Sequence, residues 1–270
     1  MTLPSPFSFN QNNLQDYQDC PRRFELRHVQ HLEWPAVETE PYLEAEHRML
    51  LGTTFHNMIR QAIAGVPIDA LTDQVIEPEV ARWWQAWMAF YPTLPLGKRW
   101  AEFSTSVPFH DDRINAVFDL LVVQPDDRIS IFDWKTTPKR LKGDMLLRRL
   151  QAMVYPWLAL RMARQLVGHE VKPDSVQMVY WFTSTPELPQ VIQYSSELDT
   201  QNTSLLENII QEIRNAPSYP LTTDTRHCKY CKFRSLCDRG SRAGSLNEQD
   251  MADDHDRSLD DLNFANLEPL

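Results

Sequence analysis

A carboxylate and an amine lie two residues apart at the end of an apolar stretch of the chain. The stretch reads ISIFDWKTT, and Asp133 and Lys135 follow its β-favouring residues. Residues two apart in a strand point to the same face, so the two side chains should project together from the end of a strand. The spacing leaves two interpretations open, because such a pair can form a structural ion pair or act jointly on a charged substrate.

A second carboxylate precedes this pair. Asp119 lies within the apolar stretch NAVFDLL, where its charge needs a partner. If the two stretches form adjacent strands, Asp119 and Asp133 can come close together. Neighbouring carboxylates repel each other unless a cation lies between them, and hard oxygen ligands suit Mg²⁺ or Mn²⁺. Such an ion activates water and polarises a phosphoryl oxygen, while Lys135 would orient the water or stabilise negative charge.

An α/β fold of alternating elements must position these residues. Apolar periodicity predicts helices over residues 8–29, 42–65, 77–92, 143–166 and 197–216. Strand-like patterns cover residues 100–109, 113–123, 128–136 and 174–183, with a further extension at 189–195. The order of the core elements is therefore α-β-β-β-α-β. We expect one domain over residues 1–244, followed by a polar, disordered tail over residues 245–270.

The charge distribution bears on the partners of the protein. The net charge is −10, but residues 247–270 carry −7 of it, with eight acidic residues and one basic residue. Five basic residues follow the Asp133–Lys135 stretch, either as solvated surface or as a nucleic-acid contact, and they are Lys139, Arg140, Lys142, Arg148 and Arg149. No apolar run is long enough to span a bilayer, and the N-terminus lacks signal-peptide features, so we expect a cytoplasmic protein.

The chain has four cysteines, of which three are clustered. Cys228, Cys231 and Cys237 form the pattern C-x2-C-x5-C, and Cys20 lies far upstream. In a cytosolic chain, clustered cysteines suggest a metal rather than disulfides. Three ligands require a fourth, so a site that uses Cys20 would join the two ends of the chain. Four thiolates can hold tetrahedral zinc or a 4Fe–4S cluster, although zinc ribbons usually pair two short knuckles.

Residues 50–160 resemble the PD-(D/E)XK nuclease superfamily in its RecB-like branch. That family combines the patterns G-x-x-x-H, G-x-x-D, D/E-x-K and Q-x-x-x-Y, in this order. Here GTTFH covers Gly52–His56, AVFD ends at Asp119, DWK covers Asp133–Lys135, and QAMVY covers Gln151–Tyr155. Ala116 stands where the pattern has glycine, a departure that removes no catalytic atom.

The resemblance implies a fold and a role for each matched residue. The fold would be the restriction-endonuclease-like core, with a central mixed sheet flanked by helices. Lys135 would assist the attacking water, and Gln151 and Tyr155, with nearby basic residues, would hold the DNA strand. The implied ligands of Mg²⁺ or Mn²⁺ are His56, Asp119, Asp133 and the backbone carbonyl of Trp134.

The cysteines also resemble a feature of this branch. CRISPR-associated adaptation nucleases and AddB-type helicase–nuclease subunits carry an iron–sulfur staple, and YQDCPRRF around Cys20 looks like its first segment. The resemblance implies a 4Fe–4S cluster bound by Cys20, Cys228, Cys231 and Cys237. Residues 1–40 and 220–240 would then contribute one site that joins the N- and C-terminal segments of the fold.

These patterns together predict a metal-dependent DNA nuclease, with exonuclease action on single-stranded ends favoured by analogy. One alternative is a non-catalytic subunit that binds DNA ends or serves as a scaffold, although such a subunit has no need for the His/Asp/Asp/Lys set. Another is a nuclease that works only with a helicase or a CRISPR adaptation protein. The sequence contains no phosphate-binding loop, so any motor would be another chain.

Overall fold

The structure, a computed structural model, describes residues 3–32, 40–137, 143–228 and 231–240 of the 270-residue chain. Three of the predicted DNA-binding residues, Lys139, Arg140 and Lys142, lie outside the described residues. So does the acidic tail over residues 245–270.

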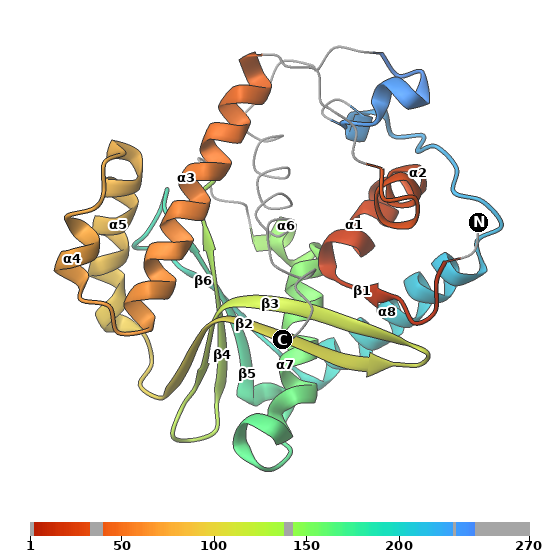
Figure 1. Cartoon of the computed structure of the whole chain (residues 1–270). Helices are drawn as coiled ribbons and strands as arrows, with labels where there is room; N and C mark the ends of the chain where they lie inside the picture. The colour runs from red at the N-terminus through yellow and green to blue at the C-terminus, as the bar shows by residue number, and fades with distance from the viewer. Residues whose placement is uncertain (1–2, 33–39, 138–142, 229–230, 241–270) are drawn as a thin grey trace.

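Six strands form a single mixed sheet (Figure 1). Their order is β1-β3-β4-β5-β6, and β2 pairs with β3. β3 and β4 are antiparallel, whereas β4 and β5 are parallel and are linked through helices. The predicted mixed sheet is confirmed, with strands β1 Ser8–Phe9, β2 Lys98–Phe109, β3 Asp112–Val123, β4 Ile129–Lys135, β5 Val176–Phe182 and β6 Gln190–Gln193.

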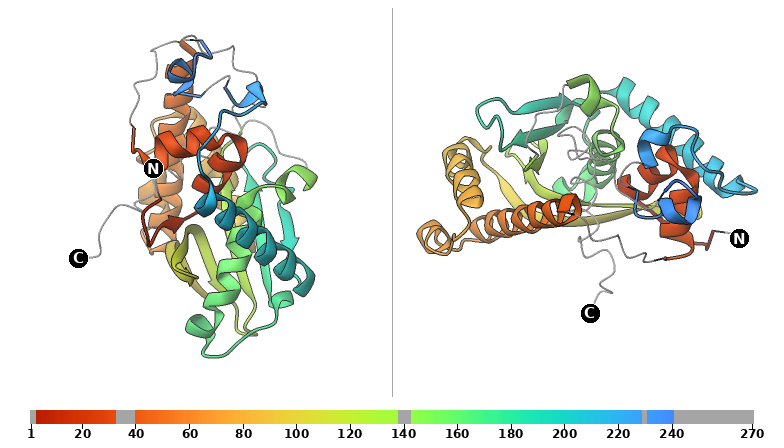
Figure 2. Two further views of the ribbon diagram at one scale, coloured as in Figure 1. Left: turned by 90° about the vertical axis from the view of Figure 1, so that its right-hand side faces the viewer. Right: turned by 90° about the horizontal axis from the view of Figure 1, so that it is seen from above.

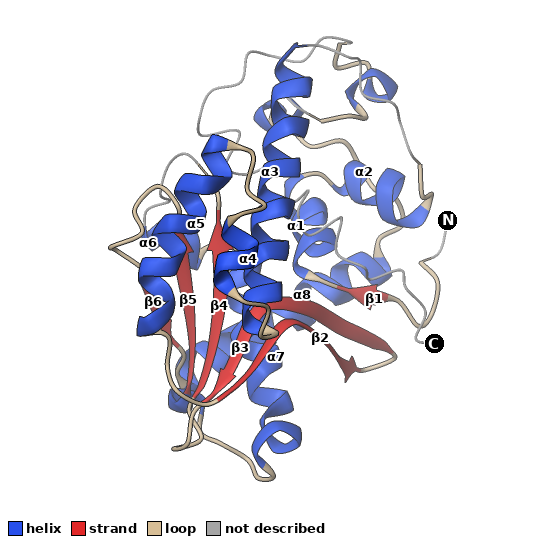
Figure 3. Cartoon of the chain, turned by 60° about the vertical axis from the view of Figure 1, so that its left-hand side comes forward, coloured by secondary structure: helices blue, strands red, loops and turns tan. Residues whose placement is uncertain are grey.

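Helices cover both faces of this sheet (Figures 1 and 3). One face packs against α3, α4 and α5, and the other against α7 and α8. The helices are α1 Gln11–Asp19, α2 Pro21–Phe24, α3 Glu40–Ile63, α4 Ile68–Thr72, α5 Pro78–Phe90, α6 Gly143–Leu147, α7 Leu150–Val167 and α8 Ser196–Asn215. No helix within the described ranges is both long enough and apolar enough to cross a bilayer.

The alternation of side chains along β4 determines which face of the sheet carries Asp133 and Lys135. Ile129 and Ile131 belong to the core that includes α7, whereas Phe132 and Trp134 belong to the core beneath α3 and α5. Because alternate residues of a strand share a face, residues 133 and 135 point towards the α7 side. The sheet thus directs a polar pair towards the helix that follows it.

The N-terminal helix is interrupted, contrary to the expectation of one helix ending at Val29. Asn10 caps α1 by accepting hydrogen bonds from the backbone of Asn12 and Asn13. Cys20 then has an extended backbone, with φ −162° and ψ 103°. A residue before proline avoids the helical region, so Pro21 ends α1 and starts α2. The break places Cys20 at a corner between two helices.

Candidate active site

The candidate site lies at a fork between β3 and β4. The two strands pair only from Leu120 to Val123 on β3, although β4 continues to Lys135. Beyond this ladder, the backbone N–H of Trp134 donates a hydrogen bond of 2.7 Å to Oδ2 of Asp119. β3 curves away from β4 in this region (Figure 1). The backbone of β4 beyond the ladder is thus bonded to the side chain of Asp119 rather than to the backbone of β3.

Asp133 and Lys135 lie side by side, as the spacing predicts. Nζ of Lys135 is 2.8 Å from Oδ2 of Asp133, and their side chains are 6% and 5% exposed. The other oxygen of Asp133 accepts a 2.8 Å hydrogen bond from Nε2 of Gln151. The Tyr180 hydroxyl in turn donates to Oε1 of Gln151 over 3.1 Å. Buried contacts therefore fix the carboxylate of Asp133 on both oxygens.

Three side chains beside this pair can hold a metal ion. One ligand atom each from His56, Glu102 and Asp119 lies within 4.8 Å of the other two. Nε2 of His56 is 3.0 Å from the backbone oxygen of Trp134, and Nδ1 is 3.5 Å from Oδ1 of Asp119. An imidazole nitrogen with carboxylate and carbonyl oxygens fits Mg²⁺ or Mn²⁺. The structure brings together His56, Asp119 and the Trp134 carbonyl, three of the ligands that the resemblance implies.

The sequence interpretation missed Glu102. No motif marks this residue, but a count along the β2–β3 hairpin finds it. Phe109 pairs with Asp112 across the turn, so residue 102 must lie opposite residue 119. The hairpin thus places a second carboxylate directly across from Asp119.

The electrostatics of the site favour protonated ligands when no cation is bound. Burial alone would lower the pKa of His56, but the negative charges of Asp119, Glu102 and Asp133 outweigh burial and raise it to about 9. Burial and the charge of Asp119 raise the pKa of Glu102 to about 7. Protons therefore offset part of the negative charge that a divalent cation would neutralise.

The expected DNA-holding residues of α7 are buried. Gln151 is 4% exposed and Tyr155 is 1% exposed. The Tyr155 hydroxyl accepts a 3.1 Å hydrogen bond from Nε2 of Gln11 in α1, and its ring meets Phe118 edge-on. Arg148 is exposed just before α7. In this conformation, Gln151 and Tyr155 connect α7 to β4, β5 and α1.

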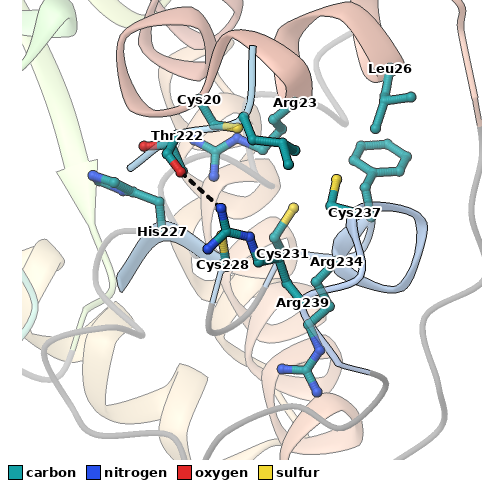
Figure 4. A pocket seen from close by; sticks show the side chains of 12 residues that line it. Cys20, Arg23, Leu26, Thr222, His227, Cys228, Cys231, Arg234, Cys237 and Arg239 are labelled. Atoms are coloured by element: carbon teal, nitrogen blue, oxygen red, sulfur yellow. Dashed lines mark hydrogen bonds between the residues drawn. The ribbon is translucent and has the colours of Figure 1, made fainter. Parts of the chain in front are cut away.

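All four cysteines border one pocket (Figure 4). They are free thiols, with Cys20 buried and the other three partly exposed. Figure 4 shows Cys20 and Arg23 on the N-terminal helices, facing cysteines from the C-terminal segment. The two segments also lie side by side in Figure 2. The backbone N–H of Arg22 donates a hydrogen bond to the carbonyl of Pro220. The pocket therefore joins both ends of the described chain.

Comparisons with known proteins bear on the family of the chain. No curated protein matches the sequence. One solved structure, described as SSO0001, has 16% identity and a TM-score of 0.39, covering 87% of this chain and 88% of its own. A second, a putative exonuclease from Eubacterium rectale, has 12% identity and a TM-score of 0.48, covering 90% and 91%. The family model of the PD-(D/E)XK nuclease superfamily matches residues 8–238, so the chain belongs to this superfamily.

Proposed function

We propose that the protein is a metal-dependent deoxyribonuclease of the RecB-like iron–sulfur branch, which acts as an exonuclease on single-stranded DNA ends. One observation carries this proposal. His56, Glu102 and Asp119 present metal-ligand atoms together at the fork beside the buried Asp133–Lys135 pair. A structural ion pair alone would not require a separate group of metal ligands beside it.

The residues divide into a metal-binding set and a group that acts on the phosphate. His56, Glu102, Asp119 and the Trp134 carbonyl would hold Mg²⁺ or Mn²⁺, with Asp133 as a further candidate ligand. A bound divalent ion supplies an acidic water and polarises a phosphoryl oxygen. The ammonium of Lys135 donates hydrogen bonds to the attacking water and to a phosphate oxygen, which stabilises the charge that develops there.

Neighbouring side chains hold this lysine in place. Asp133 keeps the Lys135 ammonium at 2.8 Å, and Gln151 fixes the orientation of Asp133. The Lys135 ammonium also lies 5.6 Å from the centre of the Tyr180 ring. Because its position is set before substrate binds, little reorganisation is needed during the reaction.

We also propose that the cysteine pocket binds a 4Fe–4S cluster. All four cysteines of the chain border this pocket, and a 4Fe–4S cluster takes four thiolate ligands, which supports the proposal. Tetrahedral zinc can also take four thiolates, so the iron content of the purified protein separates the two sites. The cluster's role is structural, since it ties together the chain segments on either side of the nuclease core.

Cleavage of end-labelled DNA tests the nuclease assignment. Protein purified without oxygen and supplied with Mn²⁺ should shorten linear single-stranded DNA and leave circular single-stranded DNA intact. Lys135→Ala should abolish cleavage, whereas Lys172→Ala should not. Lys172 is an exposed lysine beyond the C-terminal end of α7, and that end lies about 24 Å along the helix from Gln151. Full activity of folded Lys135→Ala protein would contradict the assignment, and cutting of circles would contradict the exonuclease mode.

A further inference from the structure

A buried arginine borders the cysteine pocket. Arg23 lines the pocket together with Cys20 and Cys231 (Figure 4), and its side chain is only 9% exposed. Two carboxylates of α1 hold its guanidinium. Nε lies 2.8 Å from Oδ1 of Asp16, and Nη2 lies 2.7 Å from Oδ2 of Asp19. Arg23 is thus a cation fixed at the wall of the pocket.

The carboxylates that hold Arg23 are themselves supported away from the pocket. Asp16 is 1% exposed and does not line the pocket. Its Oδ2 accepts hydrogen bonds from His28 and Arg27, at 2.8 and 3.2 Å. Asp19 also lies 3.7 Å from Nδ1 of His227. Because Asp16 and Asp19 are held in this way, the ion pairs that they form with Arg23 fix the position of its guanidinium beside the pocket.

Arg23 and Cys231 interact electrostatically. Burial raises the pKa of the Cys231 thiol, and the charge of Arg23 opposes that rise. Burial also opposes the charge of Arg23, but Asp16 and Asp19 outweigh burial and raise the pKa of its guanidinium. Arg23 therefore stays charged beside the cysteines at neutral pH.

A cluster in this pocket would carry substantial negative charge. Four thiolates around a 4Fe–4S core in its 2+ state give a net charge of −2, and uptake of one electron gives −3. A fixed, buried cation stabilises the more negative state more strongly, because the low local dielectric screens their interaction weakly. Nearby charges and hydrogen bonds to sulfur are recognised determinants of cluster potentials.

Resting on the cluster proposed above, we infer that Arg23 is a positioning residue whose fixed charge raises the reduction potential of the cysteine-bound cluster. The reduced cluster takes one electron from an external one-electron donor, which is thereby oxidised, and no bond to a cysteine sulfur forms or breaks. Arg27 provides a contrast, because it pairs with the same Asp16 but does not line the pocket.

Potentiometric titration with dithionite tests this role, with the reduced cluster followed by electron paramagnetic resonance in the anaerobic, cluster-containing protein. Arg23→Gln should lower the equilibrium constant for reduction at least tenfold, which equals about 59 mV for one electron. Arg23→Lys, which keeps the charge, should retain most of the wild-type potential. Arg27→Gln, the matched control, should shift the equilibrium constant less than twofold.

A second variant covers the case in which Arg23→Gln misfolds because Asp16 is left buried without its partner. The double variant Asp16→Asn/Arg23→Gln removes both charges and should still lower the potential, by less than Arg23→Gln alone, because Arg23 lines the pocket and Asp16 does not. An unchanged potential in a cluster-containing Gln variant would overturn the inference, as would loss of the cluster from both the Lys and Gln variants. Wild-type protein without iron would instead overturn the proposed cluster and this role together, whatever its nuclease activity.

Discussion

Glu102 lies directly opposite Asp119 in the antiparallel pair of β2 and β3, and the regular pairing of the two strands is interrupted at this position. The interruption has a backbone cause, because Glu102 has a φ of 51°, which is unusual for a residue with a side chain. Such a conformation costs on the order of 1–3 kcal/mol. The distortion occurs where the Glu102 carboxylate meets Asp119 and His56, so we interpret the strain as part of the site.

Removal of the charge of Glu102 should weaken metal binding. Glu102→Gln keeps the size of the side chain and loses an anionic ligand, so Mn²⁺ affinity should fall at least tenfold, or about 1.4 kcal/mol. Isothermal titration calorimetry measures the affinity directly. Glu170→Gln changes an exposed glutamate just after α7 and should leave Mn²⁺ affinity unchanged. Equal Mn²⁺ affinity in wild-type and Glu102→Gln protein would exclude Glu102 as a ligand.

Metal binding should release protons, and the number released should depend on pH. Metal ligation requires neutral His56 and ionised Glu102. The pKa values are about 9 for His56 and about 7 for Glu102, so both groups are protonated in metal-free protein at pH 6. At pH 8, His56 is still mostly protonated, whereas Glu102 is mostly ionised. Binding should therefore release about two protons at pH 6 and about one at pH 8. Mn²⁺ affinity should rise with pH until His56 is neutral.

Calorimetric titrations in buffers of different ionisation enthalpy give the number of protons released. A His56→Gln variant should release about one proton fewer at pH 6, where Glu102 is protonated in both metal-free proteins. Proton release that does not vary between pH 6 and pH 8 would contradict the assignment of these two groups.

Gln151 should act by positioning Asp133. Gln151→Leu removes a hydrogen bond to an Asp133 oxygen and one from the Tyr180 hydroxyl, and each lost hydrogen bond costs about 0.5–3 kcal/mol. We expect kcat to fall at least tenfold with a smaller change in KM, together with a lower denaturation midpoint. A large rise in KM with unchanged kcat would instead support direct contact with DNA.

Cys20 should contribute to iron binding as much as the distant cysteines do. Wild-type protein purified without oxygen should be brown and contain about four irons per chain. Cys20→Ala and Cys231→Ala should each lose the colour and lower the thermal midpoint to a similar degree. Colourless protein that contains zinc would contradict the cluster. Full iron content in Cys20→Ala would show that Cys20 is not a ligand.

The sequence was sufficient for five of the six described strands, whereas β1 falls inside the helix predicted over residues 8–29. β3 and β4 have strong apolar patterns, and their predicted ranges agree with the observed strands within a residue or two. Asp133 and Lys135 share a face because side chains alternate between the two faces of any strand. This alternation can be read from the local sequence alone. His56 and Gln151 required family resemblance, since a polar residue on a helix does not reveal what it faces.

Other features depend on contacts that a local pattern does not contain. The prediction of one helix over residues 143–166 was wrong, because the chain turns at Arg148 and Arg149 and forms α6 and α7. Pro156, which the pattern marks as disruptive, lies inside α7. Glu102 could have been found by pairing residues outward from the hairpin turn, but its left-handed backbone follows from the site as a whole.

The cysteine pocket also sets an order of events during synthesis. Cys20 and Cys237 both line the pocket, and 216 residues lie between them in the sequence. At about 5–20 residues per second, the ribosome needs roughly 10–40 s for this stretch. His56, Asp119 and Lys135 all emerge within that interval. The nascent chain can therefore begin to form the catalytic fork before Cys228, Cys231 and Cys237 are synthesised. The cysteine pocket then closes after the catalytic residues are in place.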